Sequence, residues 1–483
     1  MAFFQAIAKT REKDGNKTVF GEPVAITESM RLALLEWQRL FYAGGSERPA
    51  LTVVSQIYAA LCGDAALQVM DTAETDTATD DRRDELVQRL TDKWPEIVQF
   101  LMASGEMFVK VQPVNGLLEF NAVPHFNYDV LHRDVTGEPD DVVLYLDSQK
   151  GGLYYTLHER RYRAGATVTQ DDGTTEEVGM LHVDYKLTES HDANLLGAEV
   201  PLSKLYPELQ PSTVVPGVSK LGMEWVRMPV INSVDGSPDG CSIYSPAADE
   251  IMRLCRQDER SDREFLLTEP RVIVHEDAAD VDTYQDLETG QIKNRSVALP
   301  DYMYPLQGTD NSQPITVYNP VPNQEQMEAK ANEIKRNIEN IIGLRPGLLA
   351  NVQLEERTAT EVQANTDRYA ALTESIKRVC DGLLHGLTQL VIEWGVYVDG
   401  PVLADNAELG MAWGNGVLYD ADKDYARLQD MVDNYGLDSA YLLHWLEIKA
   451  LSAEEVAEIR AKYGIGAAPT ETGVLEALGM SGV

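Results

Sequence analysis

The chain has 483 residues, with 41 Lys and Arg against 78 Asp and Glu, so its formal net charge at pH 7 is 41 − 78 = −37. This balance excludes a general DNA- or RNA-binding protein, because such proteins gain affinity by neutralising phosphates with Lys and Arg. The apolar fraction of 44% allows a sizeable core. The length suggests about two to four domains, or one body with large insertions.

The four cysteines, Cys62, Cys241, Cys255 and Cys380, are far apart in the sequence. Zinc sites and disulfide frameworks use closer pairs, so free thiols in a reducing cytoplasm are expected. The apolar segment 1–8 precedes its positive charges, which is not the order of a secretory signal. No run of about 20 uncharged apolar residues occurs, so no membrane span is predicted.

The first 125 residues have a mainly helical pattern. Between Glu28 and Ala43, apolar residues recur at the spacing of one helix face: Met30, Leu34, Trp37 and Phe41. Segment 51–62 and segment 82–104 are two further candidate helices, and Gly105 is a suitable C-terminal cap for the second.

From Met107 the apolar period changes to two. Strand-like residues flank Asn115-Gly116, a dipeptide typical of a two-residue hairpin turn. Further strand-like runs lie at 142–146, 153–158 and 179–187. The sequence therefore predicts an antiparallel, meandering β region between residues 105 and 240.

After Gly240 the pattern is helical again. Ser245 followed by Pro246 predicts the cap and first position of a helix that runs to about Leu267. Residues 256–264 in this helix are all polar, so the helix cannot be buried on its own. It is either a surface helix with ion pairs along one face, or a helix packed sideways in a ring of copies.

A small strand-rich insert is predicted over residues 268–321, followed by a helix from Asn323 to Ile342 that ends at Gly343. The apolar stripe of this helix is Met327, Ala331, Ile334, Ile338 and Ile341. Arg336 lies almost opposite Met327 when each residue turns the helix by about 100°.

Arg345-Pro346-Gly347 interrupts the helical pattern. The longest helix then begins with a capping box at Thr358 and Glu361 and continues to about residue 397. At about 1.5 Å per residue it would be roughly 60 Å long. Short helices are predicted from Asp420 onward.

The sequence lacks several common catalytic and ligand-binding motifs. It has no phosphate-binding glycine loop and no dinucleotide fingerprint. Segment 217–221 lacks the last glycine of a nucleophile elbow. Segment 420–431 lacks the glycine and glutamate of a calcium loop. No catalytic residue, no cofactor and no metal ligand is therefore predicted.

The order of these segments resembles the portal proteins of tailed bacteriophages, the siphophage-type head-to-tail connectors. The resemblance covers most of the chain. It is carried by Gly105-Glu106-Met107-Phe108-Val109-Lys110 through Pro124-His125-Phe126, by Pro229-Val230-Ile231-Asn232 to Ser242-Ile243-Tyr244, and by Gly343-Leu344-Arg345-Pro346-Gly347 through Arg357-Thr358-Ala359-Thr360-Glu361-Val362.

The resemblance implies an α+β fold with portal-like architecture. Its parts would be an α/β wing (1–240), a first stem helix (241–267), a small β-rich clip (268–321), a second stem helix (322–343), a tunnel loop (344–357), a long wing helix (358–410) and a helical crown (411–483).

The resemblance also implies a function without enzymatic activity: a ring of roughly twelve copies at one capsid vertex, through which DNA is packaged and ejected. The implied partners are double-stranded DNA passing non-specifically, the large terminase subunit, the major capsid and scaffolding proteins, and a head-tail adaptor protein, but no membrane. The implied location is the virion, after assembly in the host cytoplasm.

In such a ring, twelve chains would carry a formal charge of 12 × −37 = −444. This charge repels DNA and disfavours tight binding, although at physiological salt the repulsion extends only about 8 Å from the surface. Arg336, with Lys330 and Lys335, would centre DNA in the stem channel. Alternatively, these cations pair with glutamates of the same or neighbouring helices: Glu325, Glu333 or Glu339.

The tunnel-loop residues expected near DNA are Leu348, Leu349, Asn351, Val352 and Gln353. Asn351 and Gln353 are uncharged polar groups suited to sliding contact. The three apolar residues could instead pack neighbouring loops together.

Two other functions stay open at the level of sequence. An acidic cytoplasmic hydrolase would have a pocket with perturbed carboxylates inside a single chain. Another oligomeric virion component, such as an adaptor or baseplate protein, would form rings but would have no clip between two stem helices.

Overall fold

The computed structural model describes residues 17–43, 48–63, 65–70, 77–169, 175–192, 195–268, 271–275, 281–285, 290, 292–296, 303–306, 315–318, 323–351, 359–398, 402–403 and 407–413. These residues belong to one compact unit, Met1–Trp413, whereas a second unit, Gly414–Val483, lies outside them. The predicted helices after Asp420, and nearly all of the predicted crown, therefore fall outside the described residues.

The N-terminal region is helical, as its periodicity predicts. It contains α2 (Glu28–Ala43), α3 (Pro49–Cys62) and α4 (Thr77–Ser104). The predicted apolar stripe of α2 is buried. Strand β1 (Ala66–Met70) is not predicted from the sequence. It pairs antiparallel with β16 (Glu408–Ala412), more than 330 residues later in the chain.

The hairpin predicted around Asn115-Gly116 is confirmed. It joins β2 (Glu106–Val114) to β3 (Leu117–Pro124), which pair antiparallel. Asn115 and Gly116 have φ values of 53° and 79°, which a tight type I′ turn requires and which these two residue types tolerate best. Strand β10 (Met223–Arg227) pairs with the other edge of β2.

A second antiparallel sheet contains six strands in the order β4-β5-β6-β7-β8, with β9 also paired to β7. The strands are β4 (Tyr128–Arg133), β5 (Pro139–Lys150), β6 (Leu153–Thr169), β7 (Thr175–Ser190), β8 (Ala198–Val200) and β9 (Ser212–Val215), with short 3₁₀ turns η1 (His125–Asn127) and η2 (Leu202–Lys204). The predicted meander is confirmed. Strands β6 and β7 exceed their predicted lengths because they pair with each other as far as Thr169 and Thr175.

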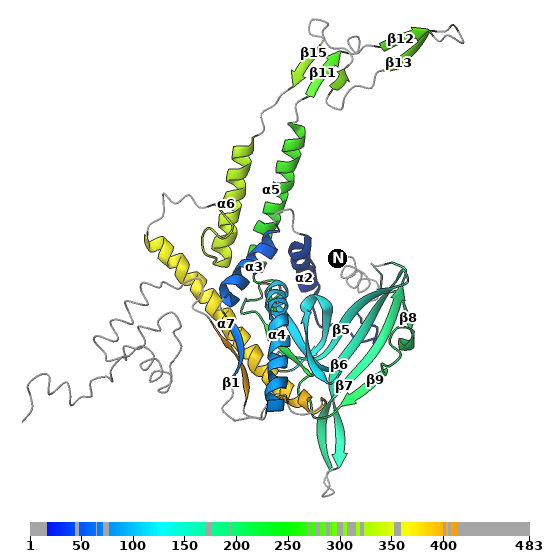
Figure 1. Ribbon diagram of the computed structural model, residues 1–483, viewed down its shortest axis with the longest axis vertical. Helices are drawn as coiled ribbons and strands as arrows, with labels where there is room; N and C mark the ends of the chain where they lie inside the picture. Colours follow the sequence, from blue (N-terminus) through cyan, green and yellow to red (C-terminus); the bar gives the residue numbers. More distant parts are fainter. Residues whose placement is uncertain are drawn as a thin grey trace, which may run out of the picture. The chain divides into compact units, whose positions relative to one another are not determined.

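Two helices, α5 (Ala248–Leu267) and α6 (Gln324–Ile342), lie side by side (Figure 1). The chain between them is rich in strands, as the sequence predicts. They are β11 (Arg271–His275), β12 (Val281–Gln285), β13 (Ile292–Ser296), β14 (Met303–Leu306) and β15 (Ile315–Tyr318), arranged as β14-β11-β15 and β12-β13.

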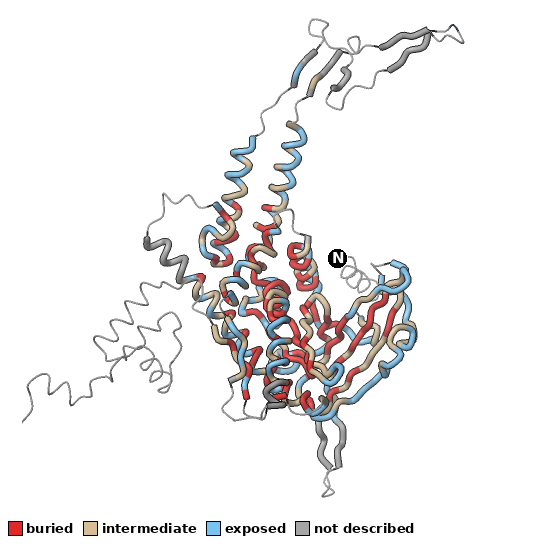
Figure 2. The backbone as a smooth tube through the Cα atoms, in the orientation of Figure 1, coloured by how far each residue is buried: buried red, intermediate tan, exposed pale blue. Residues whose placement is uncertain are grey.

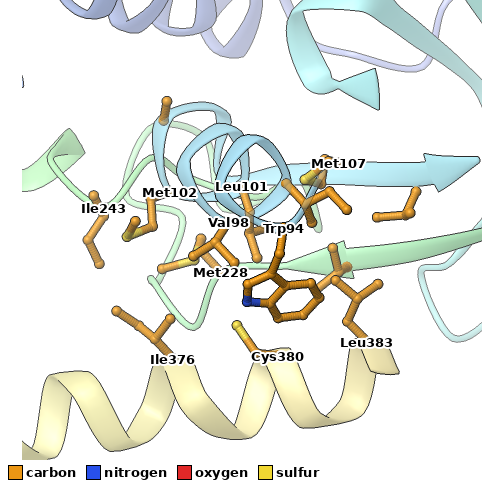
Figure 3. Packing of buried hydrophobic residues seen from close by; sticks show 14 of the residues in the cluster. Trp94, Val98, Leu101, Met102, Met107, Met228, Ile243, Ile376, Cys380 and Leu383 are labelled. Carbon is orange, nitrogen blue, oxygen red and sulfur yellow. The ribbon is translucent and has the colours of Figure 1, made fainter. Parts of the chain in front are cut away.

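The long helix predicted after the Arg345-Pro346-Gly347 break is α7 (Ala359–Gly395). Figure 3 shows Ile376, Cys380 and Leu383 of α7 and Trp94 of α4 within one layer of apolar side chains between the two helices. The same cluster includes residues of β2, α5 and α6. The architecture is therefore α+β, and one core joins the N-terminal helices, the first sheet and the base of α5 and α6.

Candidate functional site

Helix α5 begins later than its sequence predicts. Residues Ser245–Ala247 form the 3₁₀ turn η3, and α5 then starts at Ala248 without a side-chain capping hydrogen bond. The amide of Ala248 donates to the main-chain carbonyl of Ser245. The prediction that Ser245 caps the helix is therefore wrong, because a backbone turn supplies the acceptor that its hydroxyl would have supplied.

The inner turns of α5 and α6 are buried, whereas their outer turns are exposed (Figure 2). The buried residues are Ile251, Leu254 and Gln257 in α5, and Ile334, Ile338, Glu339 and Ile342 in α6. Gln257 closes the buried part, since its Nε2 atom donates to Sδ of Met327 at 3.0 Å. No described residue of α5 after Gln257 is buried.

The outer end of α5 carries three consecutive apolar side chains that face solvent. The exposed fractions are 58% for Phe265, 63% for Leu266 and 55% for Leu267. Exposed apolar groups gathered in one place mark contact sites more often than isolated ones do. Among the described residues, this apolar end of α5 is therefore left largely exposed, whereas an amphipathic helix normally buries its apolar face.

One residue of the predicted α6 stripe faces the wrong way. Ile341 is 46% exposed, and Ile342 is buried in its place. At about 100° per residue, Ile342 lies about 40° from the direction of Ile338, whereas Ile341 lies about 60° away on the other side. Ile342 therefore packs in the core, and the prediction that Ile341 belongs to the buried stripe is wrong.

The three predicted channel cations lie on α6. Lys330 is exposed, and its Nζ donates to Oε2 of Glu333 at 2.8 Å. This hydrogen bond and the charge of Lys330 lower the pKa of Glu333, with smaller contributions from Arg253 and Arg336. Lys335 is half-buried and Arg336 is exposed. Pairing within the helix, the alternative considered above, is thus present for Lys330.

The loop after α6 is held by one buried glutamate of that helix. Glu339 is 2% exposed. Its Oε1 atom accepts hydrogen bonds from the main-chain N–H groups of Gly347 at 3.1 Å, Leu349 at 2.7 Å and Ala350 at 3.0 Å. Glu339 is therefore not a partner for the stem cations, and sequence reasoning missed its role.

The predicted tunnel-loop residues fall into two groups. Leu348 and Leu349 are half-buried and pack against the core of their own chain, whereas Asn351 is exposed. Val352 and Gln353 lie outside the described residues. That these residues approach DNA stays a prediction.

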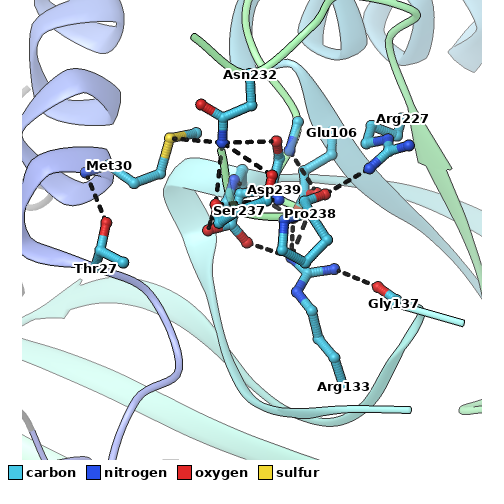
Figure 4. A network of polar contacts seen from close by, with 12 residues as sticks. Thr27, Met30, Glu106, Arg133, Gly137, Arg227, Asn232, Ser237, Pro238 and Asp239 are labelled. Atoms are coloured by element: carbon cyan, nitrogen blue, oxygen red, sulfur yellow. Dashed lines mark hydrogen bonds and ion pairs between the residues drawn. The ribbon is translucent and has the colours of Figure 1, made fainter. Parts of the chain in front are cut away.

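A second buried polar cluster lies at the start of β2 (Figure 4). Glu106, His125 and Asp239 each offer an atom within 4.8 Å of the others, a spacing that a metal ion could bridge. Arg133 already fills the cationic role there: its Nη2 lies 3.1 Å from Oε1 of Glu106 and 2.5 Å from Oδ1 of Asp239. Burial of Glu106 opposes ionisation, but His125, Arg133 and the N–H of Gly240 keep its pKa below the ordinary value. This cluster is better suited to join β2, β4 and the chain after Pro238 than to bind a metal.

A pocket of about 120 Å³ lies between α5, α6 and the start of α3. Its lining includes Pro49, Leu254, Cys255 and Met327. Burial raises the pKa of the Cys255 thiol, which is the opposite of what an activated nucleophile requires. None of the described helices is long and apolar enough to cross a membrane.

Comparison with known proteins finds no matching family model and no matching curated protein. The solved structures that contain chains similar to this one include three particles whose chains are each 12% identical to it. One is the virion of a native gene transfer agent particle (TM-score 0.39, 92% of this chain and 99% of that chain). The others are the neck of an empty particle computed with C6 symmetry (0.42, 86% and 93%) and the neck of a native particle computed with C12 symmetry (0.34, 86% and 93%).

Proposed function

We propose that the chain is a subunit of a portal: a ring at one vertex of a phage-like capsid through which DNA is packaged and later ejected. In this proposal α5 and α6 are the stem, strands β11 to β15 belong to the clip, and α7 and the N-terminal part form the wing. The clip would contact the large terminase subunit during packaging and a head-tail adaptor protein afterwards. Major capsid and scaffolding proteins would contact the ring from outside.

The observation that carries the proposal is the uncovered outer half of the α5–α6 pair. A helix with so little apolar cover from the described residues of its chain gains stability when another surface packs against it. Residues Phe265, Leu266 and Leu267 offer apolar contacts, and the charged residues around them offer pairs of both signs. Identical neighbours around a ring would supply both kinds of contact at every position.

The net charge supports a conduit rather than a DNA clamp. A ring of chains with charge −37 each repels duplex DNA over most of its surface, and exposed Arg336 is the cation that we assign to the channel. DNA would then pass without strong sequence-independent adhesion, which otherwise grows with each phosphate neutralised.

We also propose that the chain is not an enzyme. The buried carboxylates with lowered pKa values, Glu106 and Glu159, each lie against an arginine. Such pairs are better suited to a structural role than to catalysis, because the carboxylate stays charged and is buried inside the protein. This favours the portal over an acidic hydrolase.

Electron microscopy of the purified full-length chain tests the proposal. The expected result is closed rings with an axial hole wide enough for a DNA duplex and a projection formed by the insert between α5 and α6. A chain that is monomeric at every concentration refutes the proposal. Rings without that projection would instead support an adaptor or baseplate component.

A further inference from the structure

We propose that Glu339 is a positioning residue: its carboxylate occupies an anion-binding nest formed by the main chain of residues 347–350 and thereby fixes the start of the loop to the end of α6. The role of this loop in DNA passage rests on the proposed function. The attachment itself is a property of the single chain.

The geometry of the nest comes from the way in which α6 ends. Gly343 has φ 86°, in the left-handed region that glycine adopts without strain. The amides of Gly343 and Leu344 donate to the main-chain carbonyl of Glu339 at 2.9 and 2.8 Å. The Gly343 bond is that of a left-handed glycine termination, and the Leu344 bond is the longer bond of a Schellman motif to the same carbonyl. Together they turn the chain back toward the last turn of α6.

The returning chain then directs three N–H groups at one oxygen atom. They belong to Gly347, Leu349 and Ala350, at 3.1, 2.7 and 3.0 Å from Oε1 of Glu339. Successive backbone N–H groups that converge on one point form a concavity suited to an anion. Here the anion is a side chain of the preceding helix, so the loop needs no external ligand.

Burial makes the attachment specific. Glu339 is 2% exposed and Ala350 is 4% exposed, so water does not replace these hydrogen bonds readily. Leu344, which is 3% exposed, and the half-buried Leu348 pack against the core next to them. Without the carboxylate, the buried N–H of Ala350 and the part-buried N–H groups of Gly347 and Leu349 would lose their acceptor. The loop start would then have to move so that the Ala350 N–H could reach water.

Amide hydrogen exchange of the full-length chain, without DNA or terminase, tests the proposal. In Glu339→Ala, exchange at Gly347, Leu349 and Ala350 should accelerate by at least about tenfold. Gly343 and Leu344 are internal controls, because their hydrogen bonds go to the main-chain carbonyl, which the substitution keeps. Glu339→Gln should restore part of the protection, since the amide oxygen is a neutral acceptor.

Glu333→Ala is the matched control, because Glu333 lies on the same helix, is exposed and bonds Lys330 rather than the loop. It should leave the exchange of all five amides unchanged. Wild-type exchange at 347–350 in Glu339→Ala would overturn the proposal. An equal acceleration throughout β2 and α7 would also overturn it, because Glu339 would then be a general core residue. A failure to form rings would refute the proposed function and leave these exchange results valid.

Discussion

Replacing Arg133 by methionine should destabilise the fold strongly. The guanidinium lies between two buried carboxylates, 3.1 Å from Glu106 and 2.5 Å from Asp239. Its Nη1 atom also donates to the carbonyl of Gly137 at 3.0 Å. Methionine has a similar length but no charge, so both carboxylates would remain inside the protein without their cation. Breaking a buried pair in this way typically costs about 3–5 kcal/mol.

The assay is urea denaturation followed by tryptophan fluorescence, since Trp225 lies under Arg133 with 5.6 Å between the guanidinium carbon and the ring centre. Arg227→Met is the matched control. Arg227 contacts the same ring at 5.8 Å but is exposed, and its guanidinium donates to the carbonyl of Pro238, with no carboxylate partner among the described residues. We expect it to cost about 1 kcal/mol or less. Adding Glu106→Gln to Arg133→Met should recover part of the loss by removing one buried charge. Equal effects of the two arginine substitutions would refute the reasoning.

Three further outcomes follow from the structure. Ile338→Ala should lower the free energy of unfolding by about 2–5 kcal/mol, because Ile338 is fully buried, whereas Ile341→Ala, at a residue 46% exposed, should change it by less than about 1 kcal/mol; equal losses in denaturation would contradict the assigned helix face. Burial opposes ionisation of Glu159, but Arg161 and a neighbouring lysine lower its pKa to about 2. The stabilisation from ionised Glu159 should therefore be present above the unfolded pKa of about 4.5 and disappear as the pH falls toward 2. If the unfolding midpoint of Arg161→Met falls as steeply with pH as that of the wild type, the Glu159–Arg161 pair does not cause the acid sensitivity. Arg336→Glu should leave ring assembly intact and reduce the DNA content of assembled particles, and normal packaging by this variant would remove Arg336 from the channel.

Local patterns in the sequence predicted the long helices and the central strands correctly because the signals lie within a few residues of one another. The stripe of α2, the Asn115-Gly116 turn and the end of α6 at Gly343 are examples. Each depends on helix periodicity or on residues that tolerate positive φ, and neither requires knowledge of the tertiary structure.

The sequence could not predict features that depend on distant partners. Strand β1 is too short to be recognised alone, and its partner β16 lies at the other end of the unit. A glutamate at position 339 is, from the sequence alone, expected to be exposed like other charged helix residues. It is buried because the chain turns back at Gly347 and covers it. The Glu106–Arg133–Asp239 cluster likewise joins three segments that no spacing rule connects.

The position of Glu339 links the stem to the loop mechanically. Its neighbours Ile338 and Ile342 fix the last turns of α6 in the core, while its carboxylate holds the loop start through three hydrogen bonds. A shift of this turn must therefore carry residues 347–350 with it or break those bonds. Among the described residues, no hydrogen bond from the loop holds the outer turns of α6, which pack on α5. In the proposed ring, neighbouring subunits would be able to reposition them while the loop start stays in place. In the proposed ring, contacts between subunits would thus set the width of the outer stem, and Glu339 would set the position of the loop start independently of that width.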